Sequence, residues 1–148
     1  MVVIVLGLEM WVGAGRALAQ RPLGVDVSSY QGASYDWTLA KSQGIVFAWA
    51  KATEGTYDDD ADFVGNENNG KAAGIYMGAY HFCRPDLDSP GTEASFFWSD
   101  AGGYILADGK TFMPMLDVET FNGVTGATSY AQWVNDWCVD IVSDAANA

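Results

Sequence analysis

The stretch Thr111-Phe112-Met113-Pro114-Met115-Leu116-Asp117-Val118-Glu119 is short and apolar, and it ends in two carboxylates that one residue separates. Its length and its apolar side chains predict a buried β-strand. Side chains of a strand alternate between two faces, so Asp117 and Glu119 project together while Leu116 and Val118 pack on the opposite side. The stretch therefore predicts a carboxylate pair at the carboxyl end of a strand.

Three other segments rich in Val, Ile, Phe, Tyr or Trp precede this one, and longer amphipathic segments lie between them. That alternation is typical of β/α units around a parallel sheet, which places the chain in the α/β class. Gly44 and Gly74 each follow an expected helix, where a left-handed backbone is needed, and each precedes an Ile that begins a strand. The expected strands are Leu23–Ser28, Ile45–Lys51, Ile75–Phe82 and Thr111–Val118.

Polar and aromatic side chains also mark the ends of the other strands. Asp26 lies at the end of the first strand, Glu54 follows the second, and Tyr80 lies near the end of the third. The carboxyl ends of parallel strands meet at one edge of a sheet, where α/β enzymes bind their ligands. Two neighbouring carboxylates resist double ionisation, so one can keep a proton and serve as the acid that glycosidic cleavage needs. For the Asp-x-Glu motif alone, solvated carboxylates and a hard-cation site are the alternatives.

The composition restricts the kinds of partner that the chain can have. Its 148 residues are 49% hydrophobic and 18% charged, which is typical of one globular domain. The formal net charge of -12 opposes binding to a phosphate backbone. The longest apolar run, in the first eight residues, is too short to span a bilayer. We therefore expect neither a nucleic acid partner nor stable insertion into a membrane.

Residues 1–19 have the pattern of a signal peptide. An apolar run begins at Val2, and Ala17-Leu18-Ala19 is a small-x-small motif that suits signal peptidase. A disordered or loosely docked N-terminus is the alternative. Export would permit a disulfide between Cys83 and Cys138, although two buried thiols fit the sequence equally well.

Two other motifs do not predict a metal or thiol site. The acidic segment 58–62 resembles a calcium loop, but the positions of the loop glycine and of the bidentate glutamate hold Phe63 and Asn69. We expect a solvated loop there. The pattern places no third partner beside His81 and Cys83, so we expect a hydrogen-bonded core histidine and no cysteine hydrolase.

Four segments at the expected strand ends occur in a fixed order: Gly24–Gly32 (GVDVSSYQG), Lys51–Thr56 (KATEGT), Gly78–Phe82 with Arg84-Pro85 (GAYHF and RP) and Pro114–Glu119 (PMLDVE). Together they resemble glycoside hydrolase family 25, the muramidases that are lysozymes with a modified β/α barrel. The similarity extends from about Leu23 to the end of the chain. Four ordered segments are a more specific signal than the Asp-x-Glu motif alone.

The resemblance implies hydrolysis of the β-1,4 bond between N-acetylmuramic acid and N-acetylglucosamine in bacterial peptidoglycan. Glu119 would be the general acid, Asp117 would orient the substrate acetamido group or stabilise charge beside it, and Asp26 would assist charge stabilisation. Glu54 and Tyr80 would bind the sugar. The acetamido oxygen can replace a protein nucleophile, so the resemblance implies no metal and no organic cofactor.

Family domains continue through further strands, so residues 20–148 would be a partial catalytic domain, the first four β/α units of an incomplete barrel. Strands at both ends would keep unpaired backbone groups, which favours self-association. We expect a secreted or cell-wall-associated protein whose partner is peptidoglycan. The alternative is a truncated, non-catalytic glycan-binding remnant of the same fold.

Export can be tested at the N-terminus of the mature protein. Expressed in a secreting host, the protein should begin at Gln20, because the small-x-small motif places cleavage after Ala19. N-terminal sequencing of the protein in the medium measures this directly. Secreted protein that retains residues 1–19 would contradict the prediction.

Overall fold

The computed structural model describes residues 21–148, and the signal peptide expected at residues 1–19 lies outside the described residues. Four parallel strands form an open sheet in the order β1-β2-β4-β5, which confirms the α/β class and the four β/α units. The strands are β1 (Leu23–Val27), β2 (Ile45–Glu54), β3 (Asp58–Asp59, antiparallel to β2), β4 (Tyr76–Phe82) and β5 (Met115–Asp117). The helices are α1 (Trp37–Ser42), α2 (Phe63–Ala72), α3 (Pro90–Ala101), the 3-10 helix η1 (Gly102–Tyr104) and α4 (Tyr130–Asn147).

Two strands differ in length from the sequence prediction by more than one residue. β2 continues past Lys51 to Glu54, because its last two residues pair with the antiparallel strand β3. The last strand is shorter than expected, and of the residues before Met115 only Thr111 forms a bridge, to Met77. Pro114 lacks an N–H group, so it cannot donate to the ladder at the point where the strand was expected to continue.

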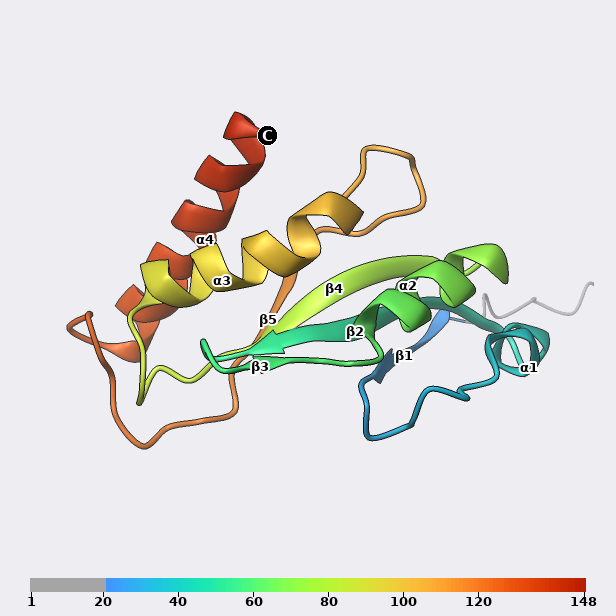
Figure 1. Ribbon diagram of the computed structural model, residues 1–148, viewed down its shortest axis with the longest axis horizontal. Coiled ribbons are helices and arrows are strands. Elements are labelled where there is room, and N and C mark those ends of the chain that lie inside the picture. Colours follow the sequence, from blue (N-terminus) through green and yellow to red (C-terminus); the bar gives the residue numbers. More distant parts are fainter. Residues whose placement is uncertain (1–20) are drawn as a thin grey trace, which may run out of the picture.

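The helices cover one face of the sheet. Figure 1 shows α3 and α4 on one side of the strands and the loops that follow β1 and β5 on the other. Gly44 and Gly74 adopt φ values of +93° and +76°, so the left-handed glycines expected after the first helices are confirmed. Each turn sends the chain from a helix directly back into the sheet.

The two faces of the sheet carry different side chains. On the helix side, Ala48, Met77 and Ala79 are at most 1% exposed and pack in the hydrophobic core. On the other side, the indole of Trp49 stacks on Phe112 with ring centres 5.0 Å apart. Toward the carboxyl ends of the strands, most side chains on that face are polar.

A buried polar network lies on the helix side of the sheet. The Nδ1 atom of His81 lies 2.7 Å from Thr53 Oγ1, and its Nε2 atom lies 2.7 Å from Glu93 Oε2. The backbone N–H of Arg84 also donates to the Glu93 carboxylate, at 3.0 Å. His81 and Glu93 are both fully buried, which confirms the hydrogen-bonded core histidine. The network ties α3 to β2 and β4.

The cysteines match neither alternative completely. Both thiols are free; Cys83 is buried and Cys138 is exposed. Burial, with the charges of Glu93 and Asp117 adding to it, raises the pKa of the Cys83 thiol to about 12. Cys83 is therefore an inert core residue, and the expectation of two buried thiols was wrong for Cys138.

The expectation of a solvated loop at residues 58–62 was also wrong in part. Asp60 is buried, and its carboxylate accepts hydrogen bonds from the backbone N–H groups of Ser29 and Asp62. Asp58 lies on β3, with a carboxylate oxygen 3.4 Å from Lys51 Nζ. The segment therefore connects β2 to the loop after β1, a contact between distant parts of the chain that local composition does not reveal.

The sheet has two outer strands in the described part of the chain. Within residues 21–148, β1 pairs only with β2, and β5 pairs only with β4. The self-association expected from such open edges stays a prediction. No helix among these residues has the length and apolar character needed to cross a membrane.

Replacing Glu93 by Ala tests the buried network. The change leaves the His81 ring and the Arg84 N–H without their partner, so we expect the free energy of unfolding to fall by about 3 kcal/mol. Chemical denaturation measures this loss, with Ser95→Ala at an exposed position of the same helix as the control. Equal stability of the two variants would show that water replaces the Glu93 carboxylate at no cost.

Candidate active site

A pocket of about 450 Å³ opens at the carboxyl ends of the strands. We call it the carboxylate pocket. It contains every site residue expected from the sequence, namely Asp26, Glu54, Tyr80, Asp117 and Glu119. The remaining lining residues are Ser28, Tyr30, Gln31, Lys51 and Phe82. Side chains from four strands and from the segments that follow β1 and β5 thus meet in one place.

The parallel register of the strands brings these side chains together. Phe82 of β4 pairs with Asp117 of β5 on one side and with Glu54 of β2 on the other. Tyr80 of β4 also pairs with Lys51 of β2. Because residues paired across a sheet point to the same face, this register aligns the polar ends of three strands.

An irregularity in β2 places Lys51 and Glu54 on the same face. Residues three apart on a regular strand point to opposite faces. The register of β2 against β4 shifts between Lys51 and Thr53, so one additional residue is accommodated and the alternation is reset. As a result, Lys51 Nζ lies 2.6 Å from Glu54 Oε2.

The Glu54 carboxylate has a donor at each oxygen. Lys51 occupies Oε2, and the Tyr57 hydroxyl donates to Oε1 at 2.5 Å. Arg84 in turn donates to the Tyr57 hydroxyl at 2.7 Å. Burial opposes ionisation, but the bonds from Lys51 and Tyr57 and the charge of Arg84 hold the pKa of Glu54 below its ordinary value. Glu54 is therefore an ionised, fully paired group, unsuited to giving up a proton.

Lys51 is the cation of the carboxylate pocket. Burial lowers the pKa of its ammonium, but the bonds and charges of Glu54 and Asp58 outweigh burial and raise that pKa above its ordinary value. The ammonium also lies 5.6 Å from the centre of the Phe82 ring. Lys51 therefore stays charged.

The pKa of Asp117 is shifted in the opposite direction to that of Glu54. Burial raises the pKa of its carboxyl, and repulsion from Glu119 and Asp26 raises it further, while Lys51 opposes the change. Three carboxylates thus share a space in which full ionisation is unfavourable. A carboxyl whose pKa is raised by burial and by neighbouring carboxylates is typical of sites that carry out acid–base chemistry.

Tyr80 lies beneath these carboxylates. Its side chain is almost completely buried, and that burial raises the pKa of the phenol, with Asp26 and Asp117 adding to the increase. The phenol therefore stays protonated and can act as a hydrogen-bond donor in the pocket.

Sequence reasoning missed Lys51 and Tyr30 as pocket residues. Both occur in the quoted motifs, so their segments were found. Strict alternation, however, does not place Lys51 beside Glu54, and nothing local to Tyr30 indicates where the loop after β1 lies. A larger hollow of about 580 Å³ between α4 and residues 105–114 has no charged residue in its lining, so it offers no acid–base chemistry.

Comparison with known proteins shows the family of the chain. The profile of glycosyl hydrolases family 25 matches residues 25–146. Lysozyme M1 of Streptomyces globisporus is 41% identical over 121 residues, which are 77% of this chain and 40% of that protein. The N,O-diacetylmuramidase of Chalaropsis sp is 38% identical over 100 residues, which are 66% of this chain and 46% of that protein.

The fold agrees as well. The crystal structure of the bacterial lysozyme from Streptomyces coelicolor matches with a TM-score of 0.73 and 38% identity, over 83% of this chain and 58% of that one. The chain thus spans about half the length of these relatives. The family profile includes all four parallel strands except the first two residues of β1. The chain therefore belongs to glycosyl hydrolase family 25.

Proposed function

We propose that this protein is a muramidase that hydrolyses the β-1,4 bond between N-acetylmuramic acid and N-acetylglucosamine in bacterial peptidoglycan. The observation that supports this most is the group Asp26, Asp117 and Glu119 around one pocket at the carboxyl ends of the strands. Relatives that share 41% and 38% identity with the chain are named a lysozyme and a muramidase. The names of the relatives thus support the proposed substrate, and the carboxylates support the proposed reaction.

Glu119 is the general acid of this proposal. It follows β5, is exposed to solvent and lines the pocket beside Asp117, so a glycosidic oxygen can reach it. Its proton passes to the oxygen of the leaving sugar as the bond from that oxygen to C1 breaks. The acetamido oxygen of the sugar that contains C1 forms a bond to that carbon in place of a protein nucleophile. Water then attacks C1 and returns a proton to Glu119.

Asp117 and Asp26 stabilise the positive charge that develops during this reaction. Asp117 accepts a hydrogen bond from the acetamido N–H and so orients the attacking oxygen. The sugar hydroxyls are bound by Tyr80 and by the pair of Glu54 and Lys51. The phenol and the ammonium can donate hydrogen bonds to these hydroxyls, whereas ionised carboxylates can only accept them.

Peptidoglycan lies outside the cell membrane, so the proposed substrate also indicates where the protein acts. We propose that it is secreted or associated with the cell wall, with residues 1–19 as signal peptide and residues 20–148 as part of the catalytic domain. The small-x-small motif Ala17-Leu18-Ala19 supports this assignment.

The general acid is tested by Glu119→Gln. The amide keeps the shape of the side chain but has no acidic proton, so we expect hydrolysis to fall by about 10²- to 10⁴-fold while glycan binding is retained. Release of new reducing ends from purified peptidoglycan measures the rate, and pull-down with insoluble walls measures binding. Asp144→Asn near the end of α4 is the matched control and should leave both unchanged.

Two outcomes would count against the assignment. Activity of Glu119→Gln within about threefold of wild type would remove Glu119 from the role of acid, given the usual size of acid catalysis. Wild-type protein that binds walls without producing reducing ends would favour the non-catalytic glycan-binding alternative.

Asp117→Asn should lower activity and raise stability. The pKa of Asp117 is raised in the folded protein, so folding binds its proton more tightly and the folded state loses stability as pH rises through that pKa. Asn removes the charge, so the variant should melt at a higher temperature than wild type at pH 7. The two melting temperatures should converge toward about pH 3, where the wild-type carboxyl is protonated.

Activity should fall by about a hundredfold in Asp117→Asn, as when one group that stabilises transition-state charge is lost. Thermal melts from acid to neutral pH and reducing-end assays measure the two effects. A variant less stable than wild type at neutral pH would show that the Asp117 charge is favourably paired.

A further inference from the structure

The loop after β1 presents an aromatic ring at the edge of the carboxylate pocket. Tyr30 lines this pocket, yet 93% of its surface is exposed, more than for any other large hydrophobic residue in residues 21–148. Within the same residues, its hydroxyl makes no hydrogen bond in the structure. A tyrosine ring so exposed gains nothing from packing, so folding alone does not account for its position.

The backbone N–H groups of the loop that carries this ring are all hydrogen-bonded. The N–H of Ser28 donates to the Gln31 side chain at 2.8 Å, and the N–H of Tyr30 donates to Ser28 Oγ at 3.2 Å. Ser29 donates to the buried carboxylate of Asp60 at 2.8 Å. The N–H groups of Gln31 and Gly32 donate to the carbonyls of Ser28 and Ser29.

Every backbone N–H from Ser28 to Gly32 therefore has an acceptor. Gly32 adopts a φ of +79°, which completes the turn in a conformation that other residues rarely adopt. The exposure of Tyr30 is thus a property of an ordered loop. A ligand that contacts the ring pays little ordering entropy in the backbone, which favours affinity.

The chemistry around the ring indicates the ligand. Asp26, Asp117 and Glu119 line the same pocket, so the part of the ligand beside the ring is favoured when it is neutral and donates hydrogen bonds. A purely apolar group would leave these carboxylates desolvated and unpaired. A pyranose ring satisfies both conditions, because its hydroxyls donate to carboxylates and its C–H face is weakly positive. An aromatic face is negative and attracts such C–H groups.

We propose that Tyr30 is a sugar-binding residue whose ring stacks on a pyranose unit of the glycan next to the carboxylates. This inference rests on the proposed function and adds a specific contact to it. Tyr30 thereby sets how tightly the glycan is held, while the carboxylates carry out the chemistry.

The test measures binding to a soluble tetrasaccharide of alternating N-acetylglucosamine and N-acetylmuramic acid. The full chain carries Glu119→Gln in every sample, so the ligand is not cleaved. Calorimetric titration gives the dissociation constant. Tyr30→Ala should raise it about tenfold, the scale expected for loss of an aromatic contact residue, and Tyr30→Phe should stay within about twofold because the ring remains.

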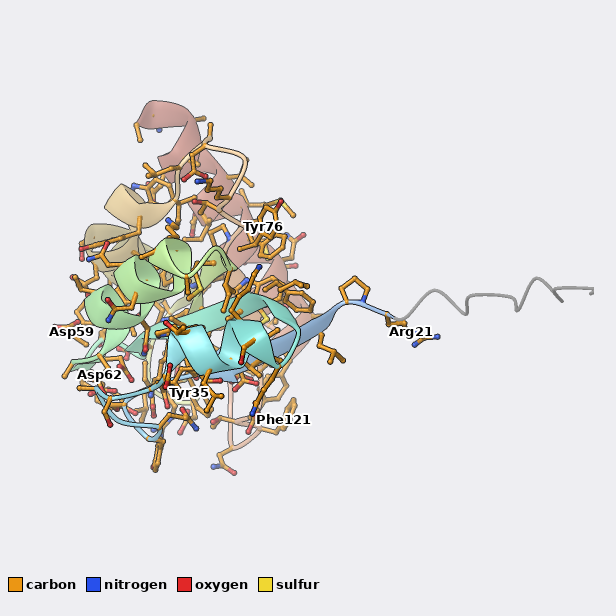
Figure 2. All side chains as sticks on the ribbon, turned by 90° about the vertical axis from the view of Figure 1, so that its right-hand side faces the viewer. Arg21, Tyr35, Asp59, Asp62, Tyr76 and Phe121 are labelled. Atoms are coloured by element: carbon orange, nitrogen blue, oxygen red, sulfur yellow. The ribbon has the colours of Figure 1, made fainter. Side chains whose placement is uncertain are left out.

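Tyr76→Ala is the matched control. Tyr76 is another exposed tyrosine, at 47%, but it begins β4 at the opposite end of the strands. Figure 2 shows it far from Phe121, which follows the pocket residue Glu119 by two positions. Its removal should leave binding unchanged. Thermal melts of Tyr30→Ala should match the parent protein, since the ring makes no packing contact to lose.

The outcomes separate this inference from the proposed function. If the parent chain binds the tetrasaccharide and Tyr30→Ala binds equally well, the role of Tyr30 is wrong and the muramidase proposal stands. If Tyr30→Phe weakens binding as much as Tyr30→Ala, the hydroxyl is the contact and stacking is wrong. If the parent chain binds no glycan, the proposed function and this inference fail together.

Discussion

The pairing of β4 with β2 on one side and with β5 on the other is the constraint on which the rest of the structure depends. It sets Lys51 beside Tyr80, and it sets Glu54 and Asp117 on either side of Phe82. A slip of one residue would turn each of these side chains to the helix side of the sheet and bring core alanines to the pocket. The core and the carboxylate pocket are therefore specified by the same register.

The charges of the pocket divide into a paired and an unpaired part. Glu54 and Lys51 neutralise each other at 2.6 Å, with Tyr57 completing the set of donors to the carboxylate. Within residues 21–148, Asp26, Asp117 and Glu119 form no such ion pair, and repulsion from Asp26 and Glu119 helps raise the pKa of Asp117. The unpaired part costs stability, as is common where a site is built for chemistry. The paired part keeps the Lys51 ammonium next to the unpaired carboxylates.

The two faces of the sheet are joined through neighbouring residues. Thr53 contacts His81 on the helix side, and the next residue, Glu54, faces the pocket. Glu93 holds the backbone N–H of Arg84, whose guanidinium reaches Tyr57. Because buried hydrogen bonds are costly to break, this network restricts the positions of the strand ends that carry the site. The buried histidine thus supports the pocket without entering it.

Local sequence was sufficient for the order of the elements and for the carboxylate pair. Apolar runs predicted the four parallel strands, and Gly44 and Gly74 predicted the helix ends, because both signals depend on residues close together in the chain. Asp117 and Glu119 followed from alternation along one strand, and the family motifs added the other acids. These features needed no knowledge of which segments meet in space.

Only the tertiary structure decided how the pocket is completed. The irregularity that brings Lys51 to Glu54 arises where β2 pairs with β4, so it depends on a partner far along the chain. Asp60 is buried because Ser29 lies against it, and the loop that holds Tyr30 takes its shape from that same contact. Alternation and composition describe one segment at a time, whereas these positions are set by hydrogen bonds between segments. For that reason the sequence by itself determined the elements and their acids, and folding determined the cation and the exposed ring beside them.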